Sequence, residues 1–586
     1  MNRPNPRMNP STGPSTAHSA TSPDATGRRS FLQGLAVGGM ALGTLGLAGC
    51  GGGDDAEPVQ YRHGVASGDP LADRVILWTR ISPERDPAAV DVRWEVADAA
   101  DFSRVVARGI ERTDASRDWT VKVDATGLAA GSRFWYRFSV GDRRSPVGRT
   151  RTLPSGSVAQ VRLAVFSCAN YPAGYFNVYA EAARRDDLDA CVHLGDYLYE
   201  YDRAGYASAT ASALGREVLP AGELLTLADY RTRHAQYRGD ADLQALHAAA
   251  PMIAVWDDHE IANDAWTDGA ENHTAPAEGL YADRKAAALQ AWHEWLPVRT
   301  GSDRGTIYRS FDFGNLVSLH MLDTRLAGRA LQIDVADYLG AGGAFDAAGF
   351  TTSLSDPARS LLGSTQTAWL QQQLTASTAT WQVLGQQVLM GRMNIPAPIL
   401  FEALTPGTGV SVSAYGAIAA KAATAPLTLT PTEQAILAQP SLPYNLDAWD
   451  GYPVNREQVL GAARTLGKNL VVLAGDTHNA WASDLDDGAG NPVGVEFATS
   501  SVSSPGFETI LTDDPAALAA GLTQLIGPLQ YCDTARRGYL LVTATAAECV
   551  ANWVYVDTVA SRTYTVDAST SRKVLAGAVG RRVVAA

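Results

Sequence analysis

The sequence predicts a layered α/β domain preceded by a small all-β domain, and three observations support this prediction. Between residues 60 and 150, short alternating runs such as 92–96 and 134–138 are separated by Gly, Asp and Pro, which is typical of a β-sandwich. After a linker at 151–157 the pattern changes to strand, helix, strand, which indicates a sheet covered by helices. Five apolar strands in this second region each end in side chains suited to binding a metal or a phosphate.

Composition and charge limit the kinds of function. The chain has 586 residues, 46% hydrophobic and 19% charged, so it is globular and long enough for more than one domain. Its net charge is -14, whereas nucleic-acid-binding proteins carry an excess of basic residues. We therefore expect no nucleic-acid scaffold role. A phosphate site must therefore be made locally positive by a metal or an arginine. Of the five cysteines, Cys532 and Cys549 could pair in an oxidising compartment.

Residues 1–50 are predicted to be an export signal and not part of the fold. They contain a twin-arginine signature that begins at Arg28, followed by a Gly- and Ala-rich stretch too short and too weakly apolar for a membrane span. The segment ends in a lipobox-like Leu-Ala-Gly-Cys run at Cys50, and a Gly-rich tether follows at 51–59. We expect export by the twin-arginine machinery to the periplasm or cell surface, with a lipid anchor at Cys50. A plain cleaved signal with an incidental cysteine is the alternative.

The remaining domain boundaries follow from the changes in pattern. We expect the β-sandwich over 60–150, the α/β domain over 160–560, and a C-terminal tail over 561–586. Within the α/β domain, 330–363 and 397–440 are rich in Gly, Ala, Thr and Pro. We expect both to be long surface insertions, and insertions of this length are often lids.

The strands that end in ligand-type residues are expected at 161–166, 189–194, 252–255, 316–322 and 469–474. Predicted helices at 176–185 and 281–295, and a further strand at 381–389, lie between them. In layered α/β proteins, ligands bind beyond the carboxyl ends of the strands. The side chains that follow the five strands should therefore meet at one edge.

The residues after the first two strands indicate a metal site. Cys168 follows the first strand, and Asp196 and Tyr199 follow the second. A carboxylate can bridge two cations, and a phenolate three residues later can reach one of them. Free tyrosine has a pKa of about 10, so a phenolate ligand requires a strongly acidic metal. Phenolate, thiolate and imidazole together favour Fe³⁺ over Mg²⁺ or Ca²⁺. An ordinary buried thiol is the alternative for Cys168.

Oxygen ligands after two other strands indicate a second cation. Asp258 and Asp476 are hard donors that suit Ca²⁺ or Mg²⁺. His478 lies two residues after Asp476, so one turn could serve both metals. The alternative for this Gly-Asp-Thr-His run is an Asp-stabilised turn.

Two further residues have predicted roles in catalysis. His259 is the candidate general acid, because a histidine beside a metal ligand can protonate a leaving alkoxide; alternatively it is itself a ligand. Arg325 offers a bidentate fork for phosphate oxygens. A structural pair between Asp323 and Arg325 is the other interpretation.

These motifs resemble those of the PhoD-like alkaline phosphatases in the metallophosphoesterase superfamily. The resemblance runs from about residue 61 to residue 556 and covers the runs 62–70, 77–80, 167–168, 195–200, 256–260, 322–325, 444–453 and 475–478. It implies a four-layer α/β/β/α catalytic domain preceded by an Ig-like sandwich of the PhoD type. It also implies a site that pairs Fe³⁺ with one or two Ca²⁺ ions.

The resemblance assigns a role to each motif residue. Iron ligands would be Cys168, Asp196, Tyr199 and His478, with Asp196 bridging and Asp476 facing calcium. The pair at 258 and 259 is Asp-His where related enzymes have Asn-His, so Asp258 is assigned to calcium and His259 to the acid role. Asp257 could exchange roles with Asp258.

The predicted function is that of an exported phosphoric ester hydrolase, an alkaline phosphatase that scavenges phosphate. A metal-bridging hydroxide would attack phosphorus, the metals and Arg325 would stabilise the charge on phosphoryl oxygens, and His259 would protonate the leaving group. The partners would be a phosphate ester and the export machinery, and we expect a monomer. One alternative is a phosphodiesterase or phospholipase D-like enzyme of the same superfamily. A distant alternative is a surface-anchored binding protein.

Overall fold

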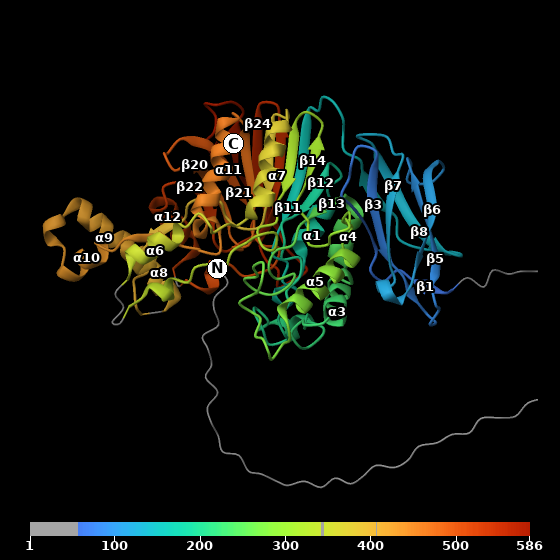
Figure 1. Ribbon diagram of the computed structural model, residues 1–586, viewed down its shortest axis with the longest axis horizontal. Coiled ribbons are helices and arrows are strands. Elements are labelled where there is room, and N and C mark those ends of the chain that lie inside the picture. The colour runs from blue at the N-terminus through green and yellow to red at the C-terminus, as the bar shows by residue number, and fades with distance from the viewer. Residues whose placement is uncertain (1–56, 341–344, 406, 512) are drawn as a thin grey trace, which may run out of the picture. The chain divides into compact units, whose positions relative to one another are not determined.

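Two large sheets form the framework of the chain (Figure 1). A computed structural model describes residues 57–586 except 341–344, 406 and 512, so the predicted export signal, its lipobox and most of the tether lie outside the described residues. Among the described residues, none of the helices has the length and hydrophobicity needed to span a membrane.

The first sheet has ten strands, and its central strands β11, β12 and β13 run parallel. Its spatial order is β26 (Val584–Ala585), β25 (Val566–Leu575), β24 (Glu548–Val556), β23 (Arg537–Thr545), β11 (Gln160–Phe166), β12 (Ala190–His193), β13 (Met252–Ala254), β2 (Val65–Gly68), β3 (Arg74–Arg80) and β7 (Thr120–Thr126).

The second sheet has seven strands, of which β15, β16, β19 and β21 are parallel. Its order is β14 (Arg309–Phe313), β15 (Val317–Met321), β16 (Trp381–Gly385), β19 (Asn469–Ala474), β21 (Pro492–Ala498), β20 (Ala480–Asp486) and β22 (Leu529–Asp533).

The two sheets pack face to face and share one core. Phe497 of the second sheet meets Trp553 of the first with ring centroids 6.2 Å apart, and the Trp381 indole donates a hydrogen bond to the Thr545 carbonyl. Apolar residues from both sheets belong to the same buried cluster. Burial of this much apolar surface is the main force that holds the layers together.

Helices cover the outer faces of the two sheets. Near the first sheet α1 packs against α4, and α3 packs against α5; near the second, α7 packs against α11. The main helices are α1 (Asn177–Ala183), α3 (Leu227–Arg238), α4 (Ala241–Ala249), α5 (Tyr281–Trp295), α7 (Gly363–Ala376), α11 (Pro453–Thr465) and α12 (Pro515–Leu525). The four-layer α/β/β/α architecture implied by the family resemblance is therefore confirmed.

The N-terminal sandwich shares its second layer with the first large sheet. One layer is a separate sheet of β10 (Gly148–Arg151), β8 (Arg133–Val140), β5 (Val90–Ala97) and β6 (Val105–Thr113), with β9 (Arg143–Arg144) beside β8. The other layer is β2-β3-β7, which continues the ten-stranded sheet through the pairing of Gly68 with Met252. A Cβ at position 68 would lie 2.3 Å from the Pro297 carbonyl oxygen, so only glycine allows this junction.

Two predicted regions differ in detail from expectation. The two insertions contain helices, namely α6 (Ala347–Leu354), α8 (Ala397–Leu404), α9 (Val412–Thr424) and α10 (Pro431–Leu437). The sequence predicts a tail over 561–586, but β25 and β26 lie there, at the edge of the first sheet. An edge strand is solvated on one side and can be largely polar, which is why its apolar alternation is weak. Cys532 and Cys549 lie in different sheets and are both free thiols.

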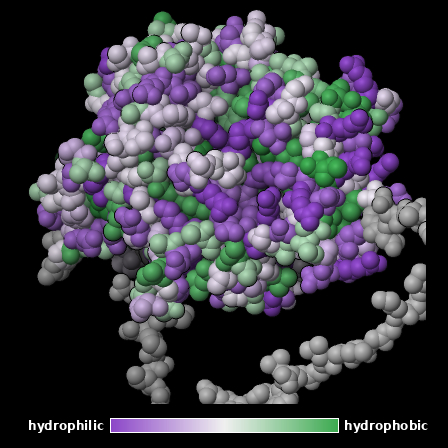
Figure 2. Space-filling model, turned by 45° about the vertical axis from the view of Figure 1, so that its right-hand side comes forward, coloured by the Kyte–Doolittle hydropathy of each residue, from purple (hydrophilic) through white to green (hydrophobic). Residues whose placement is uncertain are grey.

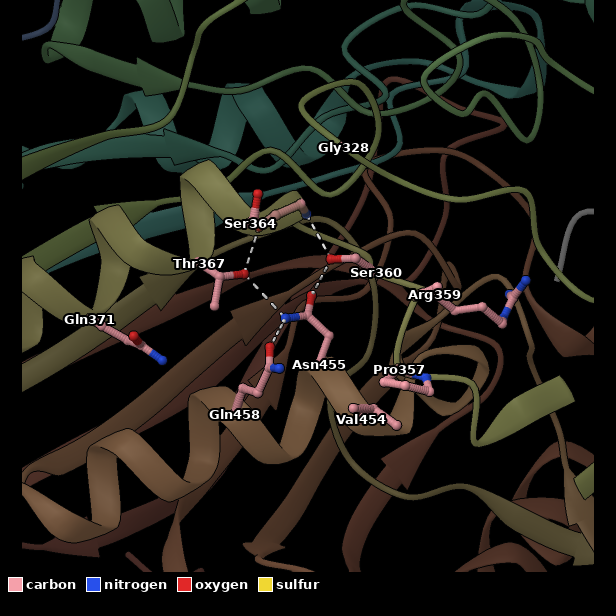
Figure 3. A pocket seen from close by; sticks show the side chains of 12 residues that line it. Gly328, Pro357, Arg359, Ser360, Ser364, Thr367, Gln371, Val454, Asn455 and Gln458 are labelled. Atoms are coloured by element: carbon pink, nitrogen blue, oxygen red, sulfur yellow. Dashed lines mark hydrogen bonds between the residues drawn. The ribbon is translucent and has the colours of Figure 1, made fainter. Parts of the chain in front are cut away.

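One face of the described chain carries a group of hydrophilic residues (Figure 2). In the view of Figure 2, hydrophilic residues gather in the middle of the face and hydrophobic residues are scattered around them. A cavity of about 540 Å³ lies between α7 and α11 (Figure 3). There the Asn455 amide donates to Thr367 and Gln458, and none of the described residues that line the cavity is Asp, Glu, His or Cys. This cavity therefore does not hold the predicted chemistry.

Candidate metal centre

The predicted site residues meet where strands of both sheets end. Cys168, Asp196 and Asp258 follow β11, β12 and β13 of the first sheet, and Arg325 and Asp476 follow β15 and β19 of the second. The site therefore lies at the carboxyl ends of two packed sheets and not at one edge of a single sheet.

The backbone at these strand ends is strained. Cys168, Asp196, Asp476 and His478 have φ values of 61°, 53°, 65° and 65°, which non-glycine residues rarely adopt. Each such residue costs about 1–3 kcal/mol, and such strain is concentrated at functional sites. The left-handed turns aim these side chains inward.

Two glycines let the strand ends approach one another. A Cβ at Gly195 would lie 2.4 Å from the Cβ of Asp257, and a Cβ at Gly475 would lie 2.2 Å from the hydroxyl oxygen of Ser167. The glycine before each aspartate therefore provides space for the neighbouring loop.

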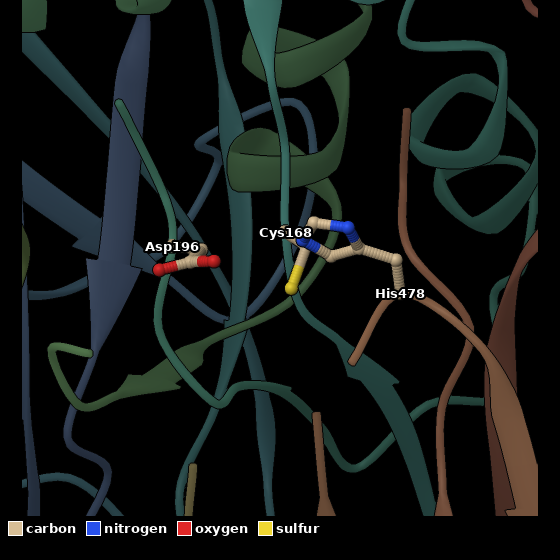
Figure 4. A group of neighbouring side chains, drawn as sticks. All are labelled: Cys168, Asp196 and His478. Atoms are coloured by element: carbon tan, nitrogen blue, oxygen red, sulfur yellow. The ribbon is translucent and has the colours of Figure 1, made fainter. Parts of the chain in front are cut away.

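The four predicted iron ligands lie together, and Figure 4 shows three of them, Cys168, Asp196 and His478. Ligand atoms of Cys168, Asp196 and His478 lie within 4.8 Å of one another. The Tyr199 hydroxyl donates to Asp196 Oδ2 at 2.9 Å and lies 3.2 Å from His478 Nε2. His478 Nδ1 is 2.8 Å from the Pro505 carbonyl oxygen. A proton donated from Nδ1 to that carbonyl would leave the Nε2 lone pair for a metal.

Two further groups of ligand atoms overlap with the first. Asp196, Asp258 and His259 form one group, and Asp257, Asp258 and Asp476 form the other. Asp196 belongs to two of the groups and Asp258 to two, so the three groups form one continuous cluster. This is the arrangement required for a carboxylate that bridges two cations.

Several carboxylate oxygens in the cluster are buried and have no hydrogen-bond donor among the described residues. They are Asp196 Oδ1, Asp257 Oδ2 and Asp258 Oδ1. A buried carboxylate oxygen without a partner is costly, and a bound cation would compensate it. The donor set of thiol, phenol, imidazole and carboxylates therefore fits a pair of cations.

Burial opposes charge on several of these groups. It raises the pKa of the Cys168 thiol, the Tyr199 phenol and the Asp196 carboxyl well above their ordinary values. Burial alone would also raise the pKa of Asp258, but the charges of Arg325 and His259 outweigh it and lower that pKa. Metal binding at Cys168 and Tyr199 must therefore release protons, which requires a strongly acidic cation.

His259 is held by a residue that sequence reasoning did not assign, Glu200. His259 Nδ1 lies 2.7 Å from Glu200 Oε2, and the His259 ring lies over Tyr199 with centroids 4.1 Å apart. Burial opposes the charged form of His259, but the carboxylates of Glu200 and Asp258 outweigh burial and raise its pKa well above the ordinary value. The only signal in the sequence was its place directly after Tyr199.

Arg325 is fully buried among carboxylates. Its guanidinium donates to Asp257, to Asp447 at 2.7 Å and to Asp476 at 3.1 Å. The predicted pair with the Asp323 side chain involves the Arg325 backbone N–H, at 2.9 Å, and not the guanidinium. Phosphate binding by Arg325 stays a prediction.

Two other acids complete the site and were not predicted from sequence. Asp447 pairs with both Arg325 and Arg329. Glu260 accepts the backbone N–H groups of Asp196 at 3.0 Å and Asp257 at 2.7 Å, so it joins two strand ends. Both lie in runs that carry the family resemblance, but their roles depend on contacts with distant parts of the chain.

Comparisons with known proteins match most of the chain. A family model described as PhoD-like phosphatase matches residues 163–553, and one described as PhoD-like phosphatase, N-terminal domain, matches residues 48–154. Alkaline phosphatase D of Bacillus subtilis (strain 168) is 35% identical over 506 residues, covering 82% of this chain and 76% of the relative. A solved structure described as the structure of PhoD superposes with a TM-score of 0.70 at 32% identity, covering 90% of this chain and 92% of that one.

Proposed function

The chain belongs to the PhoD-like phosphatase family and is a phosphoric ester hydrolase, and from this we propose that it is an exported, metal-dependent alkaline phosphatase. The observation that supports the proposal most directly is the continuous cluster of three overlapping ligand groups. It lies at the ends of parallel strands, where α/β enzymes bind their ligands.

The proposed cofactors are Fe³⁺ and one or two Ca²⁺ ions. Cys168, Tyr199 and His478 would hold iron through thiolate, phenolate and imidazole, and Asp258 and Asp476 would hold calcium through carboxylate oxygens. Asp196 belongs to two of the ligand groups and would serve both cations. When bound, these cations would supply positive charge for the phosphoryl oxygens and a nucleophilic hydroxide. Asp257 shares one of the two ligand groups of Asp258 and could exchange roles with it.

The residues around the cluster have complementary roles. His259 donates a proton to the leaving oxygen, and Glu200 fixes the orientation of its ring. Arg325 balances the charge of the surrounding carboxylates and, once they bind cations, can turn its donors toward phosphate oxygens. The reaction needs no covalent phosphoenzyme.

The proposed setting is outside the cytoplasm. The twin-arginine signature at Arg28 and the lipobox-like run at Cys50 support export in the folded state and a lipid anchor. An extracytoplasmic phosphatase that releases phosphate from esters would serve phosphate scavenging, and we propose that it acts as a monomer.

Hydrolysis of 4-nitrophenyl phosphate and bis(4-nitrophenyl) phosphate by the purified mature chain tests the proposal. Each ester is assayed with added Ca²⁺ and after chelation, and the iron and calcium contents are measured in the same preparation. We expect turnover that depends on calcium and disappears with the chelator. Preference for the diester would indicate a phosphodiesterase. No turnover of either ester by protein that contains both metals would contradict the proposal.

A further inference from the structure

Two tyrosines of the loop after β12 cover the candidate site. Beneath them Tyr199, His259 and His478 have exposed fractions of 2%, 0% and 6%. Tyr201 and Tyr206 are only partly buried. Unlike the buried residues, these two rings are therefore within reach of a substrate.

Each ring lies over a residue with a proposed role. The Tyr201 ring centroid is 5.3 Å from that of His259. Tyr206 stacks on His478 with centroids 6.0 Å apart and an interplanar angle of 29°. The centroids of Tyr201 and Tyr206 are 6.1 Å apart with an interplanar angle of 53°, so the two rings are tilted neighbours.

The loop holds these rings in place. Arg233 donates to the carbonyl oxygen of Tyr201 at 2.9 Å, and the Tyr206 hydroxyl donates to the Pro505 carbonyl at 3.1 Å. A Cβ at Gly205 would lie 2.6 Å from the Cβ of Tyr201, so the tight approach needs a glycine. In the part of the chain that the structure describes, the Tyr201 hydroxyl has no hydrogen-bond partner. The backbone contacts of the loop, and not a hydrogen bond of its hydroxyl, therefore hold the Tyr201 ring in place.

We propose that Tyr201, with Tyr206 beside it, binds the organic part of the ester and favours flat aromatic alcohols. The inference rests on the proposed function, in which His259 protonates the leaving oxygen. The group attached to that oxygen must then lie near the His259 ring, and Tyr201 is a partly exposed aromatic neighbour of that ring. Flat rings stack on tyrosine faces. Tyr206 also contacts the candidate ligand His478 and is a positioning residue as well.

A pair of monoesters with different ring areas tests this inference. Phenyl phosphate and 2-naphthyl phosphate have leaving groups of similar acidity, so a difference in kcat/KM reports contact with the ring. We expect the wild-type chain to prefer the naphthyl ester by roughly two- to tenfold, the range of aromatic pairing. Tyr201→Leu should bring this ratio close to one, mainly through KM, whereas Tyr201→Phe should retain it.

Two controls separate loss of the ring from damage to the site. The inhibition constant of inorganic phosphate, which has no organic group, should change less than twofold in Tyr201→Leu. Tyr415→Leu makes the same chemical change on α9, outside the proposed site, and should leave the ratio unchanged. An unchanged naphthyl-to-phenyl ratio in Tyr201→Leu would overturn the inference. Failure of the wild-type chain to hydrolyse either ester would instead overturn the proposed function.

Discussion

At the scale of the residue, Glu200 is a buried carboxylate whose charge is stabilised by hydrogen bonds. Its carboxylate accepts hydrogen bonds from the Asn263 backbone at 2.8 Å and the Asn272 amide at 2.7 Å, in addition to its contact with His259. Burial would raise the pKa of Glu200, but the charge and hydrogen bond of His259 outweigh it, so this pKa is lowered. A charged Glu200 accepts the Nδ1–H of His259 and so fixes the tautomer and the orientation of the ring.

The role of His259 predicts an effect that depends on the leaving group. His259→Ala should slow hydrolysis of an alkyl phosphate by about 10²–10⁴-fold, the usual contribution of a general acid. Nitrophenolate leaves without protonation, so 4-nitrophenyl phosphate should be affected much less. Glu200→Gln should also slow hydrolysis of the alkyl phosphate more than that of the nitrophenyl ester, but less strongly. Glu217 is an exposed glutamate, so Glu217→Gln is the control. Equal losses on both esters would show that His259 acts only as a ligand.

Cys168 allows a test of the metal centre that does not depend on turnover. Serine replaces a soft thiolate by a hard hydroxyl that is far less acidic, so Cys168→Ser should lower the iron content per chain while calcium is largely retained. Metal analysis after purification measures both. Cys191→Ser alters a buried thiol on β12, away from the cluster, and should keep full iron content. Loss of iron in both variants would point to misfolding.

The residues of the site differ in how well sequence could predict them. Cys168, Asp196 and His478 follow apolar strands directly, and strand ends are where ligands gather. Glu200, Glu260 and Asp447 could not be assigned, because their partners lie on other segments and no local pattern records such contacts. Asp323 does pair with Arg325, but through the Arg325 backbone N–H, because the fold brings three closer carboxylates to the guanidinium.

At the scale of the element, regular patterns were predicted best. The helix over 281–295 and the strand over 469–474 match α5 and β19 at both ends, because each has a long, consistent apolar pattern. Strand β25, next to the short edge strand β26, alternates weakly and was missed. The continuity of the sandwich with the first sheet could not be predicted, since it depends on one close approach at Gly68.

This junction predicts a specific loss of stability. In Gly68→Ala the new methyl group would lie against the carbonyl oxygens of Pro297 and Met252, and overpacking of this kind costs about 1–3 kcal/mol. The midpoint of urea unfolding should fall accordingly. A Cβ at Gly222 has no heavy atom within 4 Å, so Gly222→Ala should stay within about 0.5 kcal/mol of wild type. Equal stability of the two variants would mean that the backbone around Gly68 can move to accommodate a methyl group, and would contradict this prediction.

At the scale of the whole molecule, buried neutral histidines couple stability to pH. His234 on α3 is 1% exposed and stacks on Trp295 with an interplanar angle of 10°. Burial, helped by the charges of Arg238 and Arg233, lowers its pKa to about 3. In the unfolded chain this histidine has its ordinary pKa of about 6.5, so it binds a proton below that pH, whereas in the folded chain it stays neutral until about pH 3.

Stability should therefore fall as the pH drops from about 6.5 toward 3. Each such histidine contributes up to about 1.4 kcal/mol per pH unit, because the unfolded state binds the extra proton. His234→Phe keeps the ring stacking and removes the titration. Its urea midpoint should decline less steeply than that of wild type between pH 7 and pH 5. An identical slope in both proteins would contradict this account.

The pairing of β11 also determines when the fold can form. On one side β11 pairs with β12, which follows soon after it in the chain, but on the other side it pairs with β23, where Gln160 faces Thr545. During translation the middle of the first sheet must therefore wait for almost the last segment to leave the ribosome. A product that stops early exposes the open side of β11 and cannot complete its core. If export accepts only folded chains, the sheet itself acts as a check that synthesis has finished.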